Sequence, residues 1–382
     1  MKERLNHLFT AIYGHGPEIV VRSPGRINLI GEHTDYNKGL VLPAAINRYV
    51  YLGLGAREDD QVFLYAEKYK ERLQVDLGAL EHSRTHWANY ILGVIAQFKN
   101  KGLSVGGINM CIMGDIPDGA GLSSSAALEC ATAYAINTFF NHQLARKELA
   151  FLGQRAEHEY VGVNCGIMDQ FSSILGKKDQ AILLDCKTIA YKYVPLETPG
   201  YEILLLDTGV KHALASSAYN DRQASCQQGV AWVKEKYPQV DSLRDISLAQ
   251  LRECVYEEDH AIYQKCKYVV QENLRVERAA AALKNRDVKS LGDILFTAHW
   301  ALSKEYEVSC RELDFLVGFA EDSPKVAGSR MMGGGFGGCT INLVECGCAE
   351  EFAREAAALY ENEFNRELTS MQVEIVDGTE II

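Results

Sequence analysis

A stretch rich in glycine and serine, Pro117–Leu128, constrains the fold of this chain more than any other. It reads Pro-Asp-Gly-Ala-Gly-Leu-Ser-Ser-Ser-Ala-Ala-Leu. Before it, Ile108, Met110 and Ile112 alternate with other residues, a period that predicts a strand with one buried face. After it, Ala126–Phe140 is rich in alanine and free of proline and glycine, which predicts a helix. The stretch is therefore expected to be a loop that joins a buried strand to a helix.

The composition of this loop suits a bound anion. Gly119 and Gly121 allow a positive φ and a close approach of the backbone. Ser123, Ser124 and Ser125 offer hydroxyls and helix-capping chemistry where the helix begins. The free N–H groups and the positive end of the helix dipole would face whatever the loop holds. No Gly-Lys-Ser/Thr follows, so the loop is not a Walker A motif. On its own, the stretch fits either a phosphate-binding loop or an ordinary corner capped by serine.

Length and composition set the outer limits. A chain of 382 residues has room for two domains, and 47% hydrophobic with 24% charged residues is typical of a globular protein. The net charge of −12 argues against nucleic-acid and anionic-membrane partners. No apolar leader and no long apolar run are present, so we expect a cytoplasmic protein, and a monomer. The eleven cysteines, without a CxxC pair, are expected to be reduced thiols.

A second polar loop, Gly31–Gly39, lies between the predicted strands Arg26–Ile30 and Leu40–Ile46. Four ionisable or amide side chains fall within six positions, and they are Glu32, His33, Asp35 and Asn37. A loop of this kind between apolar strands is either a polar pocket or an exposed turn with capping residues.

Two single residues allow two interpretations each. Trp87 lies on the amphipathic pattern of a predicted helix, where it is either a core residue or an aromatic cover for a nucleotide base. Asp169 lies just beyond a turn that contains glycine, at the start of the segment Met168–Leu175, where an acid is either a helix cap or a catalytic base.

The pattern of elements predicts two domains, residues 1–195 and 196–382. The first quarter of the chain is rich in strands, whereas residues 216–319 have mainly helical spacing. Gly333–Gly338 then separates two strands with five glycines in six positions, more than a hairpin turn requires. So dense a turn indicates close approach of the backbone to another part of the molecule.

Four segments resemble, in order, one family of kinases. Pro24–Asn37 (Pro-Gly-Arg-Ile-Asn-Leu-Ile-Gly-Glu-His-Thr-Asp-Tyr-Asn) resembles the galactokinase signature. Gly119–Ala127 resembles the phosphate loop of the galactokinase, homoserine, mevalonate and phosphomevalonate kinase superfamily. Asn164–Gln170 is similar to the galactokinase segment that carries the catalytic acid, and Met332–Gly338 to the third superfamily motif. The resemblance extends from about residue 20 to the end of the chain.

This resemblance implies a fold and a reaction. The fold would be α+β with two domains, an N-terminal one related to a ribosomal-protein fold and a C-terminal ferredoxin-like one, with the site in the cleft between them. The reaction would be ATP-dependent phosphorylation of the anomeric hydroxyl of D-galactose to galactose 1-phosphate. The alternatives are a kinase for N-acetylgalactosamine or arabinose, and a non-catalytic sensor that binds galactose and ATP.

The resemblance also implies roles for individual residues. Asp169 would accept the proton of the sugar hydroxyl beside the cation Arg26, and Ser125 and Glu157 would be ligands of Mg²⁺. Trp87 would lie near adenine. The phosphates would be wrapped by Gly119, Ala120, Gly121, Leu122, Ser123, Ser124 and Ser125. The sugar would be contacted by Glu32, His33, Thr34, Asp35, Gly166 and Tyr219.

Overall fold

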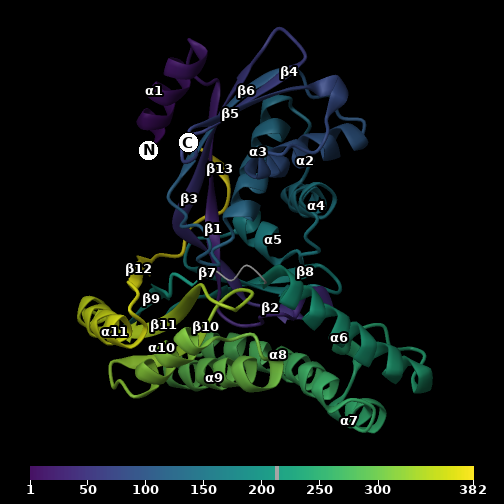
Figure 1. Cartoon of the computed structure of the whole chain (residues 1–382), viewed down its shortest axis with the longest axis vertical. Coiled ribbons are helices and arrows are strands. Elements are labelled where there is room, and N and C mark those ends of the chain that lie inside the picture. The colour runs from purple at the N-terminus through teal and green to yellow at the C-terminus, as the bar shows by residue number, and fades with distance from the viewer. Residues whose placement is uncertain (211–214) are drawn as a thin grey trace.

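The computed structural model describes the backbone of residues 1–210 and 215–382. It describes the side chains of residues 1–210 and 220–382. Its first half is built on a six-stranded sheet in the order β13-β1-β3-β6-β4-β5 (Figure 1). These strands are β1 (Ile19–Asn28), β3 (Pro43–Ala56), β4 (Gln61–Ala66), β5 (Glu71–Asp76), β6 (Ile108–Gly114) and β13 (Glu380–Ile381). One face carries α2 (His86–Asn100), α3 (Ser124–Phe139), α4 (Arg146–Ala156) and α5 (Met168–Leu175), and α1 (Lys2–Tyr13) packs on the other.

Strand β6 leads into the glycine- and serine-rich loop, and both of its faces are buried, although the sequence predicted only one. Met110 and Ile112 pack beneath the helices α2–α5 in the main hydrophobic core. Cys111 and Met113 point the other way and pack with Leu5 of α1 in a smaller core. The prediction was wrong on this point because the covering helix α1 is distant in sequence from the strand that it covers.

The second half has a four-stranded sheet in the order β10-β11-β9-β12. Its strands are β9 (Tyr201–Asp207), β10 (Val326–Met331), β11 (Cys339–Glu345) and β12 (Thr369–Val373). Its helices are α6 (Ala215–Lys236), α7 (Leu248–Val255), α8 (His260–Lys284), α9 (Val288–Ala301), α10 (Arg311–Glu321) and α11 (Ala349–Phe364). Along β9, Leu204 and Leu206 pack towards α10 and α11, and Leu205 packs into the main core. No described helix combines the length and apolar character that crossing a bilayer requires.

The two halves are joined by more than one connection. A three-stranded sheet, β2 (Leu40–Val41), β7 (Gln180–Asp185) and β8 (Ala190–Pro195), lies against α8. At the end of the chain β13 returns to the first sheet, where Ile381 pairs with Val21 of β1. The two termini therefore lie at the same end of the molecule (Figure 1). The domain division near residue 195 stays a prediction.

Candidate active site

The loop between β6 and α3 has the backbone that its glycines predict. Gly119 and Gly121 have φ values of 80° and 73°. Helix α3 begins at Ser124, and Ser123 occupies its N-cap position with a φ of 58°. The position of Ser123 suggested a helix cap, but its hydroxyl makes no capping hydrogen bond. It donates instead to Oδ2 of Asp169 at 2.5 Å, so the N–H groups of the first turn are left to other acceptors.

Asp169 lies in the first turn of α5 and is gripped by Arg26 of β1. The guanidinium Nε and Nη2 donate to the two carboxylate oxygens at 2.8 and 2.9 Å, a bidentate pair. Nη1 of Arg26 donates to the carbonyl of Gly121, and the Arg26 side chain is 5% exposed, against 29% for Asp169. The structure places no capping bond on Asp169. The arrangement fixes a carboxylate against the glycine- and serine-rich loop and leaves it accessible.

A small cavity of about 90 Å³ lies beside this carboxylate. Its walls are Arg26, Glu32, His33, Asp35, Cys165, Gly166, Met168, Asp169, Gly333 and Gly334. Four of the predicted sugar contacts are thus brought together with the predicted base. Thr34 is not on these walls, because its hydroxyl donates to the carbonyls of Gly31 and Leu40 inside the loop. Tyr219 lies outside the residues whose side chains are described.

Gly166 permits the close packing of this cavity. A Cβ atom at this position would lie 1.8 Å from Oδ2 of Asp35, a separation that no side chain can accommodate. Any other residue here would displace the carboxylate or the segment that leads to Asp169. The glycine in Asn164–Gln170 therefore has a steric reason, which the sequence alone did not reveal.

Burial controls the charges in the cavity. Burial, and then the negative charge of Asp169, raise the pKa of Asp35 to about 7. Burial lowers the pKa of His33 to about 3, so its imidazole is neutral. The His33 ring lies within hydrogen-bond distance of the Tyr36 hydroxyl and the Gly334 carbonyl, at 2.8 and 3.2 Å. The cavity is therefore lined by hydrogen-bonding groups, and His33 adds no positive charge to that of Arg26.

The Asp35 pKa gives a signed stability prediction. The folded chain keeps this proton to about pH 7, whereas the unfolded chain loses it near pH 4. The free energy of unfolding from this group should therefore fall between about pH 4 and 7, and be constant above. In Asp35→Asn that loss is absent, so the variant should gain on the wild type across this range in urea denaturation. The exposed Asp241, whose pKa is lowered by Lys38, gives a control, and Asp241→Asn should stay parallel to wild type there. Parallel curves for Asp35→Asn would contradict the burial of an acid in the cavity.

Glu32 has a different environment from its neighbours. It is 1% exposed, and its Oε1 accepts from the backbone N of Gly333 at 2.9 Å. Its Oε2 accepts from Nδ2 of Asn28 and from the guanidinium of Arg330, which is fully buried. Burial raises the pKa of Glu32, and the Arg330 charge opposes that rise. Glu32 therefore connects the polar loop to the glycine-rich turn after β10, as well as lining the cavity.

The sequence analysis missed Arg330, which organises this region. Its Nε donates to the carbonyl of Leu29 at 2.8 Å and its Nη2 to that of Asn28 at 2.7 Å, across 301 and 302 residues of sequence. The glycines that follow Arg330 then reach the glycine- and serine-rich loop, and a Cβ at Gly338 would lie 3.4 Å from the carbonyl of Ala120. The predicted close approach of this turn is thus to the glycine- and serine-rich loop.

Glu157 lies near Ser125, at the end of that loop. Glu157 lies in a π-helical turn, Glu157–Val161, that follows α4. Burial, and then the charge of Asp169, raise the pKa of Glu157 to about 7, and hydrogen bonds from Cys165 and Gln170, with a smaller effect of Ser125, oppose the rise. Gln170 Nε2 donates to both Glu157 and the buried Glu129, at 2.9 Å each. The sequence analysis gave Gln170 and Glu129 no role.

These groups fit a cation that also has ligands from a substrate. After burial, the charge of Glu157 raises the pKa of Glu129 and the charge of Asp169 raises the pKa of Glu157, and a divalent ion would relieve this repulsion. The oxygen donors of Ser125 and Glu157 are those that Mg²⁺ prefers. Among the described residues, however, no group of three or more His, Cys, Asp and Glu side chains could hold a metal ion. A metal here would take its remaining ligands from phosphates and water.

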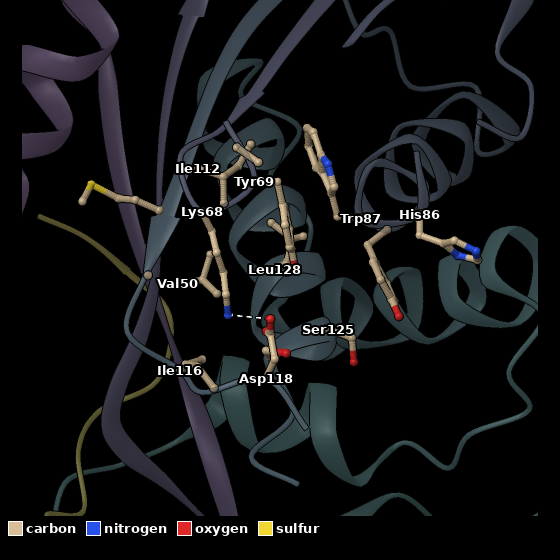
Figure 2. Close-up of a pocket in the computed structure, with 15 residues that line it drawn as sticks. Val50, Lys68, Tyr69, His86, Trp87, Ile112, Ile116, Asp118, Ser125 and Leu128 are labelled. Atoms are coloured by element: carbon tan, nitrogen blue, oxygen red, sulfur yellow. Dashed lines mark ion pairs between the residues drawn. The ribbon is translucent and has the colours of Figure 1, made fainter. Parts of the chain in front are cut away.

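A second cavity, of about 320 Å³, opens beside Ser124 and Ser125 (Figure 2). Trp87 and Tyr69 line it with their rings nearly parallel, 6.4 Å apart and inclined by 17°. Trp87 is only partly buried, and its Nε1 donates to Glu71 at 2.8 Å. Its ring therefore packs on the core and also lines a cavity, and the position beside a nucleotide base stays a prediction. Ser123, which bonds to Asp169 on the wall of the smaller cavity, directly precedes Ser124 and Ser125 on the wall of this one.

Comparison with known proteins agrees with this geometry. Residues 7–55 match the profile described as the galactokinase galactose-binding signature. Residues 89–177 match the GHMP kinases N terminal domain, and residues 279–362 match the GHMP kinases C terminal profile. A galactokinase of Thermotoga petrophila is 42% identical over 95% of this chain and 99% of its own length. One of Roseiflexus is 39% identical over 98% of this chain and 95% of its own length.

Solved structures lead to the same family. The crystal structure of Lactococcus lactis galactokinase complexed with galactose superposes with a TM-score of 0.95 and 35% identity, and covers 99% of both chains. A mevalonate kinase structure shares the fold at a TM-score of 0.64 and 19% identity. These matches confirm the predicted α+β class. This chain belongs to the galactokinase family.

Proposed function

We propose that the chain transfers the γ-phosphoryl group of ATP to the anomeric hydroxyl of D-galactose, giving galactose 1-phosphate and ADP. One observation carries this proposal. Ser123 donates to the Asp169 carboxylate on the wall of the small polar cavity, and the next two residues, Ser124 and Ser125, line the larger cavity with aromatic walls. A sugar in the first cavity and a nucleotide in the second would meet at that carboxylate. Phosphoryl transfer depends mainly on such positioning.

The small cavity would orient the sugar. Glu32, His33, Asp35 and the backbone at Gly166 would bind its hydroxyls, and Tyr219 would complete the contacts. Asp169 would accept the hydrogen bond of the anomeric hydroxyl and take its proton as the bond to phosphorus forms. The bidentate contact from Arg26 keeps the Asp169 oxygens in a fixed plane and adds positive charge where negative charge develops.

The glycine- and serine-rich loop would hold the triphosphate. Its backbone from Gly119 to Ser125, with the free N–H groups of the first turn of α3, presents donors to phosphate oxygens. Trp87 would lie near the adenine ring. Ser125 and Glu157 would hold Mg²⁺, which would offset the negative charge of the phosphates. The net charge of −12 supports small-molecule substrates, and action as a cytoplasmic monomer is part of the proposal.

The metal assignment predicts unequal effects of two neighbouring glutamates. Glu157→Gln should raise the Mg²⁺ concentration required for half-maximal rate by at least about 10-fold. Glu159→Gln is the matched control, because Glu159 is exposed and bonds to Gln97 instead of Ser125. Initial rates over a Mg²⁺ titration measure both. Equal effects at the two positions, or none at either, would show that Glu157 is not a ligand.

A sugar panel tests the substrate. With galactose, glucose, N-acetylgalactosamine and arabinose, we expect sugar-dependent ADP release to be greatest for galactose. Glucose should be at least about 10²-fold poorer in kcat/KM, because an equatorial C4 hydroxyl leaves a buried polar group without its partner. Asp35→Ala should narrow that difference. Preference for N-acetylgalactosamine or arabinose would favour a kinase for that sugar. Binding of galactose and ATP without ADP release would favour a non-catalytic sensor.

A further inference from the structure

One ion pair at the mouth of the larger cavity has no role in the scheme above. Nζ of Lys68 lies 2.6 Å from Oδ2 of Asp118, and the side chains are 48% and 41% exposed (Figure 2). Lys68 belongs to the turn between β4 and β5, and Asp118 directly precedes Gly119 of the glycine- and serine-rich loop. Both side chains line the cavity. The pair thus joins one wall of the cavity to the start of this loop.

The cavity is poor in positive charge. Of the described residues that line it, Lys68 is the only lysine or arginine, and His86 is the only histidine. Arg26, on the other side of the loop, already donates from Nε, Nη1 and Nη2 to Asp169 and Gly121. A nucleotide polyphosphate brings several negative charges into a protein whose own net charge is −12. Lys68 is the ammonium group that can meet them.

The Asp118 carboxylate makes this assignment sharper. A negative charge beside a phosphate-binding loop repels phosphate unless a cation offsets it. In the free chain Lys68 provides that offset, and a half-exposed pair of this kind is weak. A phosphate group carries more charge and more acceptor oxygens than one carboxylate, so it competes well for the same ammonium. Exchange of Lys68 from Asp118 to a phosphate is therefore favourable.

The turn that carries Lys68 is held in place by its backbone. The N–H of Glu67 donates to the carbonyl of Ile112 at 2.9 Å, and that of Lys70 donates to Glu67 at 3.1 Å. The next residue, Tyr69, stacks on Trp87 across the cavity. Only rotation of the flexible Lys68 side chain is needed to move its ammonium from Asp118 into the cavity, so the exchange requires no change of fold.

We propose that Lys68 is a nucleotide-binding residue whose ammonium pairs with Asp118 in the free chain and transfers to a phosphate group of the bound nucleotide. The proposal rests on the proposed function, in which this cavity takes ATP. It assigns Asp118 a holding role that opposes nucleotide binding, and it predicts that the Lys68 contribution depends on the phosphates of the ligand and not on its base or ribose.

The test measures the Kd of adenosine, ADP and ATP by calorimetry, without sugar. Lys68→Met should weaken ADP and ATP by about 10-fold and leave adenosine within about twofold, the expected loss for a charge-assisted contact. Lys68→Arg should retain most of the affinity. Lys70→Met removes the same charge from the same turn but does not line the cavity, and it should match wild type. The Lys68→Met loss should shrink at high salt.

The variant Asp118→Asn distinguishes a direct contact of Lys68 with the phosphates from a simple offset of the Asp118 charge. In the wild-type background it should tighten ADP and ATP by about threefold, because Lys68 no longer has to leave a partner. In the double variant Lys68→Met/Asp118→Asn, the loss caused by Lys68→Met should persist. Three results would overturn the proposal. The first is that Asp118→Asn abolishes the affinity loss caused by Lys68→Met, and the second is that Lys68→Met weakens adenosine as much as ADP and ATP. The third is that Lys68→Met and Lys70→Met have equal effects on these affinities. If wild type itself binds ADP no better than adenosine, the assignment of the cavity to ATP fails as well.

Discussion

Asp169→Asn should lower kcat by about 10²-fold or more, with the Kd of ATP nearly unchanged. An amide has almost the shape of the carboxylate, but it cannot take the hydroxyl proton and cannot accept from both Arg26 donors. The larger cavity, proposed to bind the nucleotide, does not include Asp169 among its walls, so nucleotide binding should be spared. Steady-state kinetics with galactose, together with calorimetry of ATP binding, measure the two quantities separately.

Ser123→Ala provides the control for this substitution. It removes the third hydrogen bond to Asp169 but leaves the carboxylate and its Arg26 pair in place. We expect a loss of kcat at least about 10-fold smaller than for Asp169→Asn. If Asp169→Asn retained most of its kcat, or lost ATP affinity to the same extent, Asp169 would have a structural role only.

Arg330→Met should lower the free energy of unfolding by about 3–5 kcal/mol, because it leaves the Glu32 carboxylate buried without its counter-charge. The carbonyls of Leu29 and Asn28 also lose their donors. Those residues precede the sugar-binding loop, so the Kd of galactose should rise as well. Urea denaturation measures the first effect and calorimetry with galactose the second.

Two further variants separate the buried pair from a general loss of charge. Arg311→Met removes an arginine from an exposed pair with Glu363, and it should cost less than about 1 kcal/mol. Adding Glu32→Gln to Arg330→Met removes the unpaired charge and should restore part of the stability. A stability of Arg330→Met equal to that of Arg311→Met would contradict the assigned role of the buried pair.

Local patterns were enough to predict the framework of the site. The alternation before Pro117 and the alanine-rich run after it predicted the strand, loop and helix that the structure contains. The polar loop from Gly31 and the segment around Asp169 were predicted from side-chain type and from family resemblance. The structure places Glu32, His33, Asp35 and Gly166 on one cavity with Arg26 and Asp169. Such segments are readable because short-range backbone chemistry determines them.

The interactions that hold these segments together could not be predicted from the sequence. Arg330 bonds to Asn28 and Leu29 about three hundred residues away, and no local period marks a residue for such a partner. The position of Ser123 predicted a helix cap, but the Ser123 hydroxyl donates to the charged carboxylate of Asp169 in α5, which is a stronger acceptor. Burial of the second face of β6 depends on α1 in the same way. Tertiary packing decides each of these.

Phosphorus NMR of the products tests the central claim most directly. Wild-type enzyme, ATP, Mg²⁺ and D-galactose should give ADP and one new phosphomonoester in equal amounts. Its phosphorus should couple to the anomeric proton of the sugar, because Asp169 is proposed to take the proton of the C1 hydroxyl. Phosphorylation at another hydroxyl, or ADP without a sugar phosphate, would contradict this account of the site.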